Sequence, residues 1–212
     1  MAKSKQALFA DLIVRVQHCN FCPRMQHRKK VLGFPNGSVD SSVLFIAEAP
    51  GRLGADKFGI PLYGDQTGRN FEMLIASAGI NRESIFITNA VLCNPRTPAG
   101  NNDSPTLSEI RNCSAYLREI LEIIKPKYVV PLGAAALASL NAIKPHKIKL
   151  SGGVGELFSW NGFQVYPLFH PSPRAFIKRP KAEQLQDYEN LACLLKSCDL
   201  LVGVAKQGVR TL

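Results

Sequence analysis

Three polar residues follow short apolar runs in this sequence, and their side chains could serve one reaction. They are Glu48, Asn89 and His170. A carboxylate such as that of Glu48 can orient or deprotonate a water molecule. The carboxamide of Asn89 offers an acceptor and a donor side by side, which suits an amide-like edge such as that of a pyrimidine base. The imidazole of His170, held in a loop by Pro171 and Pro173, can donate a hydrogen bond to a developing anion.

Each of these side chains also has a structural explanation that the sequence leaves open. Glu48 could cap the turn that follows it, Asn89 could make turn hydrogen bonds, and His170 could be a core histidine with satisfied partners. Their shared position at the ends of apolar runs makes one common site plausible without naming its reaction.

Four cysteines have a spacing that could hold a metal centre. Cys19 and Cys22 form a Cys-x-x-Cys pair directly before Pro23, and Cys93 and Cys113 lie near the middle of the chain. Four thiolates suit either a zinc ion or a 4Fe–4S cluster, and the spacing does not choose between the two. A single Cys-x-x-Cys pair is also a redox dithiol motif, which is a further alternative.

Composition narrows the class of partner. The chain has 212 residues, with 26 Lys and Arg against 16 Asp and Glu, so its net charge is +10. A basic excess of this size favours a polyanionic partner, of which nucleic acid is the commonest. No apolar run reaches the ~18 residues that cross a bilayer, and the N-terminus lacks a signal-peptide pattern. We therefore expect a cytoplasmic protein with no membrane partner, and we interpret Cys193 and Cys198 as small core or surface residues.

The elements that position these residues follow from hydrophobic patterning. Continuous apolar runs predict buried strands at 42–47, 85–91, 128–132 and 163–169. Helical spacing and capping patterns predict helices at 5–18, 68–78, 106–124, 133–141 and 182–196. The alternation predicts an α/β fold, a three-layer sandwich around a short, mainly parallel four-stranded sheet. We expect one domain over 1–212, with a core at 5–198 and a tail at 199–212.

In their order along the chain, these motifs resemble those of the uracil-DNA glycosylase superfamily, over roughly residues 15–195. Ala47-Glu48-Ala49-Pro50-Gly51 is similar to the family's first motif, and His170-Pro171-Ser172-Pro173 is similar to its second. Thr88-Asn89 is similar to its central strand. The iron–sulfur branch, family 4, has cluster ligands that match Cys19, Cys22, Cys93 and Cys113.

The resemblance implies a role for each matching residue. Glu48 would position or activate the water that attacks the deoxyribose C1′, and His170 would bond uracil O2 and stabilise the departing anion. The base-binding residues would be Ala49, Pro50, Gly51, Leu62, Tyr63 and Asn89. The DNA-contacting loop would be Ser172, Pro173 and Arg174, with Arg174 or Phe176 as the wedge beside the flipped nucleotide. The four cysteines would hold a structural 4Fe–4S cluster, with zinc as the alternative.

Three departures from the family pattern bear on base choice. Ala47 stands where the family commonly has glycine, and Leu62 stands where it has the phenylalanine that stacks on uracil. Tyr63 or Phe58 could substitute for that ring. The stretch Gly64-Asp65-Gln66-Thr67-Gly68 is more similar to family 5.

The resemblance therefore implies a monomeric bacterial or archaeal enzyme that flips uracil out of DNA and hydrolyses its N-glycosidic bond in base excision repair. The alternatives are a glycosylase with a broader range of deaminated bases, such as hypoxanthine or xanthine, and a catalytically weak iron–sulfur or zinc DNA-binding protein.

Overall fold

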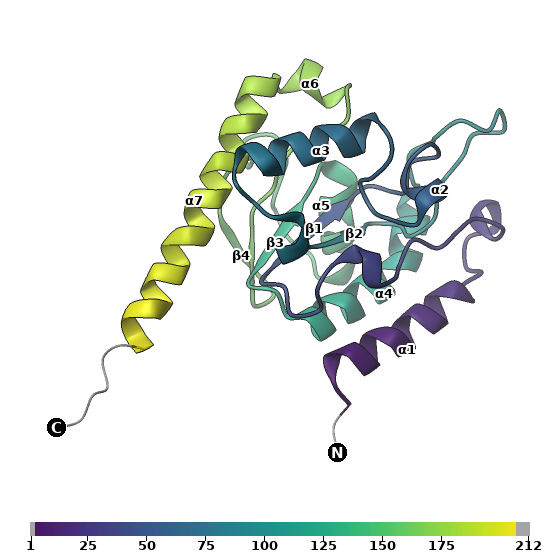
Figure 1. Cartoon of the computed structure of the whole chain (residues 1–212). Coiled ribbons are helices and arrows are strands. Elements are labelled where there is room, and N and C mark those ends of the chain that lie inside the picture. Colours follow the sequence, from purple (N-terminus) through teal and green to yellow (C-terminus); the bar gives the residue numbers. More distant parts are fainter. Residues whose placement is uncertain (1–2, 207–212) are drawn as a thin grey trace.

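The protein is described by a computed structural model that covers residues 3–206, with side chains placed through Lys196. Its centre is one five-stranded sheet with the order β2-β1-β3-β5-β4 (Figure 1). The strands are β1 (Val43–Ala47), β2 (Phe86–Asn89), β3 (Tyr128–Pro131), β4 (Phe158–Trp160) and β5 (Phe163–Val165). The pairs β1–β2, β1–β3 and β3–β5 are parallel, and only β4–β5 is antiparallel among the described pairs.

Helices cover both faces of this sheet. The helices are α1 (Lys5–Gln17), α2 (Ala55–Phe58), α3 (Gln66–Ser77), α4 (Leu107–Ile124), α5 (Ala134–Ile143), α6 (Ala175–Lys178) and α7 (Lys181–Lys206). Helices α1, α4 and α5 share one core with Leu44 and Ile46 of β1. Helices α3 and α7 share the other core with Val43, Phe45 and Ala47 of the same strand (Figure 1).

This alternation follows from strand geometry, since successive side chains of a strand point to opposite faces. All five residues of β1 are buried, as expected for a strand in the middle of a sheet covered on both faces. The structure thus confirms the predicted three-layer α/β sandwich.

The start of α4 is the clearest local signal that the sequence carries. Thr106 Oγ1 accepts from the Glu109 amide at 3.3 Å, and Glu109 Oε2 accepts from the Thr106 amide at 2.8 Å. This reciprocal capping box satisfies two amides that the first turn of a helix otherwise leaves unpaired. The helix therefore begins where the sequence predicted, directly beside the loop at 94–105.

The sheet has one strand more than the predicted four. The missed strand, β4, forms a hairpin with β5 through Asn161 and Gly162, whose φ angles are 49° and 85°. An Asn-Gly pair in this conformation is the preferred two-residue hairpin turn, so the signal was present in the sequence. The predicted fourth strand at 163–169 is real but short, and beyond Val165 only an isolated bridge, Leu132 with Leu168, continues it.

Two further boundaries differ from expectation. The short helix α2 lies between the predicted strand at 42–47 and the predicted helix at 68–78, where no helix was expected. The last helix, predicted to end near 196, continues to Lys206, so part of the expected tail is helical. Residues 207–212 and the Cys198 side chain lie outside the described residues, whereas Cys193 is exposed on α7. Within the described chain, no helix combines the length and apolar character needed to span a membrane.

Candidate active site and cysteine cavity

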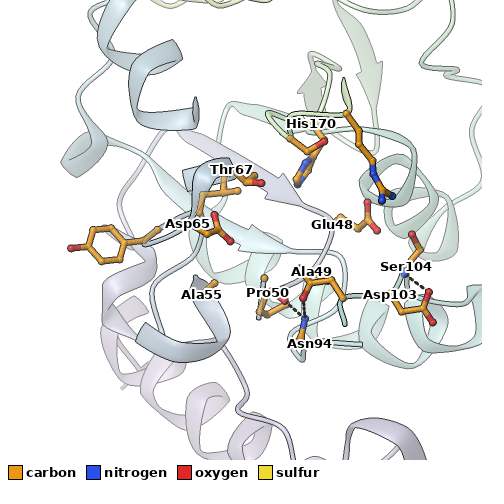
Figure 2. Close-up of a pocket in the computed structure, with 16 residues that line it drawn as sticks. Glu48, Ala49, Pro50, Ala55, Asp65, Thr67, Asn94, Asp103, Ser104 and His170 are labelled. Carbon is orange, nitrogen blue, oxygen red and sulfur yellow. Dashed lines mark hydrogen bonds between the residues drawn. The ribbon is translucent and has the colours of Figure 1, made fainter. Parts of the chain in front are cut away.

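A pocket of about 440 Å³ opens at the carboxyl edge of the parallel strands. Glu48 follows β1 and His170 follows the extension of β5, and both side chains line it. Figure 2 shows His170 and Glu48 on one side of the pocket, with Asp65 and Thr67 across from them. The structure therefore brings together a carboxylate and an imidazole that lie far apart in the sequence.

Backbone pairing fixes both of these residues. The Glu48 carbonyl accepts from the Val91 amide at 3.2 Å, which continues the β1–β2 pairing beyond the strands. Before His170, the Leu168 carbonyl accepts from the Gly133 amide at 2.8 Å. Gly133 has a φ of 89° and its α-carbon faces the β-carbon of His170, so a side chain at 133 would be strained. Glycine at this position allows the close approach.

The His170 imidazole is neutral at physiological pH. Its surroundings desolvate the charged form and lower its pKa to about 4, although part of the residue remains open to the pocket. A neutral imidazole carries one N–H donor and, because it is uncharged, needs no counter-ion in the pocket. The ring can thus donate a hydrogen bond to an oxygen that gains negative charge.

This environment predicts an unusual titration. In proton NMR of the protein, the His170 ring should titrate near pH 4, whereas an ordinary histidine titrates near 6.5. Because the unfolded chain binds this proton at about pH 6.5 and the folded chain does not, stability should decrease as the pH falls from 6.5 to 4. A His170 resonance that titrates at or above pH 6.5 would contradict this description of the pocket.

The loop after Glu48 forms another wall of the pocket through Ala49, Pro50 and Gly51. The Pro50 carbonyl accepts from Nδ2 of Asn94 at 2.6 Å. Asn94 Nδ2 also lies 3.0 Å from Asn102 Oδ1, which accepts from the Arg52 amide at 2.9 Å. Sequence reasoning missed Asn94 and Asn102, which fix the shape of the first motif.

A second carboxylate, that of Asp65, also lines the pocket, and the sequence analysis assigned it no role. Asp65 caps α3, because its Oδ1 accepts from the Gly68 amide at 2.9 Å. Its other oxygen lies so close to Gly51 and Gly54 that a β-carbon at either position would collide with it. These two glycines therefore allow the first motif to pack against the amino end of α3.

The apolar side of the pocket contains Leu62 in place of an aromatic ring. Leu62 is 7% exposed and its φ is 49°, a conformation that costs a non-glycine residue roughly 1–2 kcal/mol. Such strain is typical of functional sites. Tyr63 also lines the pocket but is 45% exposed, and Phe58 is not among the lining residues. Leu62 is thus the largest buried apolar side chain among the residues that line this pocket.

The loop after His170 closes the pocket on one side. Ser172 and Arg174 line it, and Pro173 between them is exposed. The Pro171 carbonyl accepts from Nδ2 of Asn70, a buried residue of α3, at 2.8 Å. Asn70 therefore holds the backbone beside His170, a role that no pattern in the sequence indicated.

We expect Asn70→Ala to lower turnover by roughly 10- to 100-fold, because a small displacement of the His170 loop is enough to misplace the imidazole. The same change at Asn190, whose Oδ1 only accepts from Gln186 on the surface of α7, is the matched control. Single-turnover rates and thermal unfolding should be compared. Equal rates for both variants would show that Asn70 does not position the loop.

Asn89, the third predicted site residue, is not among the residues that line the pocket. It ends β2 in register with Ala47, directly beside the residue before Glu48. The side chain is 2% exposed, and its Nδ2 has no hydrogen-bond partner. A buried donor without a partner is rare, and it is available to a ligand that reaches it.

The four predicted cysteine ligands gather in a separate cavity. Cys19, Cys22, Cys93 and Cys113 all line it, together with the apolar side chains of Phe21, Met25 and Val91. They come from the loop after α1, the segment after β2 and the body of α4. The cavity thus joins the amino-terminal segment to the central part of the chain.

The donor set of this cavity fits a metal centre. Cys113 Sγ accepts from the Leu92 amide at 3.4 Å, and Cys22 Sγ accepts from Asn112 Nδ2 at 3.6 Å. Bonds of this kind stabilise metal-bound thiolates. Burial raises the pKa of Cys93 to about 11 and that of Cys113 to about 12, so without a bound cation both thiols stay protonated.

The lining suits both of the centres considered from the sequence. Four thiolates are the ligand set of a structural zinc site and of a 4Fe–4S cluster alike. All four cysteines line this one cavity, so either centre would join the same segments of the chain.

Arg24 connects the cysteine loop to the wall of the pocket. Its guanidinium binds both carboxylate oxygens of Glu109 on α4, at 2.5 and 2.7 Å. It also donates to Asp103 Oδ2 at 2.7 Å and to the Ser104 carbonyl at 3.0 Å. Asp103 and Ser104 line the pocket, so the cysteine cavity and the pocket are joined by one ion-pair network.

Comparisons with known proteins agree with this geometry. The family model described as the Uracil DNA glycosylase superfamily matches residues 34–192. A protein of Thermotoga maritima named type-4 uracil-DNA glycosylase is 32% identical over 184 residues, which are 86% of this chain and 90% of the relative. One of Archaeoglobus fulgidus with the same name is 31% identical over 85% of this chain and 87% of the relative. A type-5 uracil-DNA glycosylase of Pyrobaculum aerophilum is 27% identical over 78% of this chain and 83% of the relative.

Proposed function

The chain belongs to the uracil DNA glycosylase superfamily, and from this premise we propose that it excises uracil from DNA by hydrolysing the N-glycosidic bond. The observation that carries the proposal is the pocket at the sheet edge, where Glu48 and a neutral His170 face one space. A base inside a duplex is out of reach of such a pocket, so the target nucleotide must flip out, at a cost of a few kcal/mol.

Breaking the glycosidic bond separates charge between the sugar and the base. Negative charge develops on the uracil, and the N–H of neutral His170 donates a hydrogen bond to its O2 without a counter-ion. Positive charge develops on the deoxyribose, which the Glu48 carboxylate and the DNA phosphates stabilise. Glu48 also orients the water that attacks C1′.

Recognition of the base edge falls to Asn89. Its Nδ2 is the buried donor without a partner, and its Oδ1 and Nδ2 together match the O4 and N3–H edge of uracil. Contact requires that the base reach deeper than the present lining of the pocket, to the end of β2. We propose that the flipped base does this as it displaces water from the pocket.

The base range is set by the apolar side of the pocket. Leu62 stands where an aromatic ring would stack on uracil, and a leucine covers less of a flat base. We propose that other deaminated bases, such as hypoxanthine and xanthine, are accepted in addition to uracil. The backbone groups of Ala49, Pro50 and Gly51 contact whichever base enters the pocket.

The loop at 172–178 contacts the DNA beside the flipped nucleotide. Arg174 lines the pocket and can reach a phosphate, whereas Phe176 is half-buried. The most exposed apolar residue of this segment is Ile177 on α6, at 83%. Of the two wedge residues predicted from sequence, Arg174 is the better placed, and Ile177 adds an apolar tip.

We propose that the four cysteines hold a 4Fe–4S cluster, which clamps the amino-terminal segment to α4 and contributes stability without taking part in the reaction. The four thiols that line one cavity and their N–H···S bonds support a thiolate-bound centre, with zinc as the alternative. Through Arg24 the clamp also supports the pocket wall at Asp103 and Ser104.

A base screen tests the proposed function. Oligonucleotides with a single uracil, hypoxanthine, xanthine or mismatched thymine are incubated with the protein and then treated with alkali, which cleaves at abasic sites. We expect cleavage at uracil and slower cleavage at hypoxanthine and xanthine. If the protein binds these oligonucleotides but cleaves none of them, it is a DNA-binding protein that has the glycosylase fold without the activity.

A further inference from the structure

We propose that Phe58 and Tyr63 form a stacking subsite for the base next to the flipped nucleotide, in a strand that is unpaired at that point. This inference rests on the proposed glycosylase function and goes beyond it, because it assigns a second base contact outside the pocket. The two side chains are among the exposed large apolar residues of the described chain, at 47% and 45%.

The two aromatic rings form one preformed shelf at the rim of the pocket. Their centroids are 5.6 Å apart and their planes cross at 89°, an edge-to-face pair that leaves flat ring surface open. Tyr63 lines the pocket and Phe58 does not, so the shelf begins at the mouth and leads away from it.

Gly64 fixes the position of the Phe58 ring. Its φ is 85°, and a β-carbon there would collide with the Phe58 ring. The ring therefore packs directly on the Gly64 backbone while part of its surface faces solvent. An exposed aromatic that is held in place loses little conformational entropy when a base stacks on it.

Basic groups around the shelf suit the phosphates of a strand. The Lys57 ammonium lies over one face of the Phe58 ring, 5.3 Å from its centroid, so a positive charge stands directly beside the shelf. Lys29 Nζ donates to the Lys57 carbonyl at 2.8 Å, which places a second lysine beside the first. Aromatic faces interleaved with lysines are the usual surface for single-stranded nucleic acid.

The target base itself is an unsuitable occupant of this shelf. That base must reach Glu48 and His170, whereas Phe58 does not line their pocket. A neighbouring base can reach the shelf only when it leaves its own stack, which is easier in a single strand than in a duplex. The subsite therefore predicts a preference for single-stranded substrate.

The test combines substitutions in the protein with removal of a base from the substrate, in the manner of a double-mutant cycle. The probes are single-stranded oligonucleotides with one uracil, with intact neighbours or with an abasic tetrahydrofuran residue on its 5′ or its 3′ side. Affinity is measured with the cleavage-resistant 2′-fluoro form of the uracil nucleotide, and kcat/KM with the ordinary one. The variants are Phe58→Leu and Tyr63→Leu, with Phe34→Leu as the control at an exposed phenylalanine outside the pocket.

Removal of one neighbouring base should weaken binding by the wild-type protein about 5- to 150-fold, the equivalent of the ~1–3 kcal/mol of one base–aromatic stack. Phe58→Leu should lose a similar factor on the intact strand and little more on the abasic one. Phe34→Leu should keep the full sensitivity. The loss in Phe58→Leu should be smaller on duplex DNA.

The inference is overturned if the wild type is insensitive to both abasic neighbours, if Phe58→Leu and Tyr63→Leu keep full sensitivity, or if the protein does not bind the strand. The proposed function fails separately: a protein that binds with this sensitivity but leaves the ordinary uracil strand uncleaved has the subsite without the glycosylase activity.

Discussion

His170→Ala should lower single-turnover excision of uracil by about 10²–10³-fold, the loss expected for one preorganised donor to a developing anion. The substitution removes the N–H that would stabilise the departing uracil and leaves the rest of the pocket wall in place. Because the ring is neutral, its removal does not change the charge of the site at pH 7. The loss should therefore be constant between pH 6 and 8.

The controls separate chemistry from binding and folding. His18→Ala removes an exposed histidine at the end of α1 and should leave the rate unchanged. The affinity of His170→Ala for a cleavage-resistant uracil strand should stay within a few-fold of wild type. A rate loss below about five-fold, or one matched by an equal loss of affinity, would mean that His170 is not the donor.

Cys113→Ser should abolish the proposed 4Fe–4S centre and lower stability by at least about 4 kcal/mol, in the range of losses that follow removal of a metal or disulfide. For a chain of this size that corresponds to a decrease in melting temperature of about 8–16 °C. Cys113 is a buried residue of α4, so the loss of its thiol separates the cysteine loop from the helix.

Iron and sulfide content, the visible colour of the purified protein and its thermal unfolding measure this effect. Cys193→Ser, at an exposed position of α7 outside the cysteine cavity, is the matched control and should keep the iron and sulfide content of the wild type. Activity of the Cys113 variant should also decrease, because Arg24 supports the pocket wall from the cysteine loop. Unchanged iron content and melting temperature would show that Cys113 does not hold a metal centre.

The sequence predicted the parts of the molecule that depend on residue type and local spacing. Apolar runs gave the four parallel strands, and the Thr106–Glu109 pattern gave the start of α4. Glu48 and His170 were predicted to meet because parallel strands end at one edge, and they do. The four cysteines were likewise predicted to gather in one place.

The residues that sequence reasoning missed act through contacts between distant segments. Asn94 bonds the Pro50 carbonyl across 44 positions, and Asn70 bonds the Pro171 carbonyl across 101. Arg24 reaches Glu109 across 85 positions. An isolated asparagine or arginine has no periodicity, and its partner is a backbone carbonyl that any residue could supply. Only the folded chain identifies such residues.

For Asn89, the sequence predicted a site residue that the structure does not place in the pocket. Its residue type and its position at the end of β2 were predicted, but the pocket does not reach its side chain. The base contact assigned to it depends on the flipped nucleotide entering more deeply than the pocket now extends.

A crystal structure with a uracil-containing strand tests the central claim most directly. With the 2′-fluoro nucleotide to prevent cleavage, we expect the uracil in the pocket, its O2 within hydrogen-bond distance of His170 and its O4 and N3 paired with the Asn89 amide. The Glu48 carboxylate should face C1′ with a water between them. Uracil bound elsewhere, or an Asn89 amide that stays unpaired when the pocket is filled, would contradict the account.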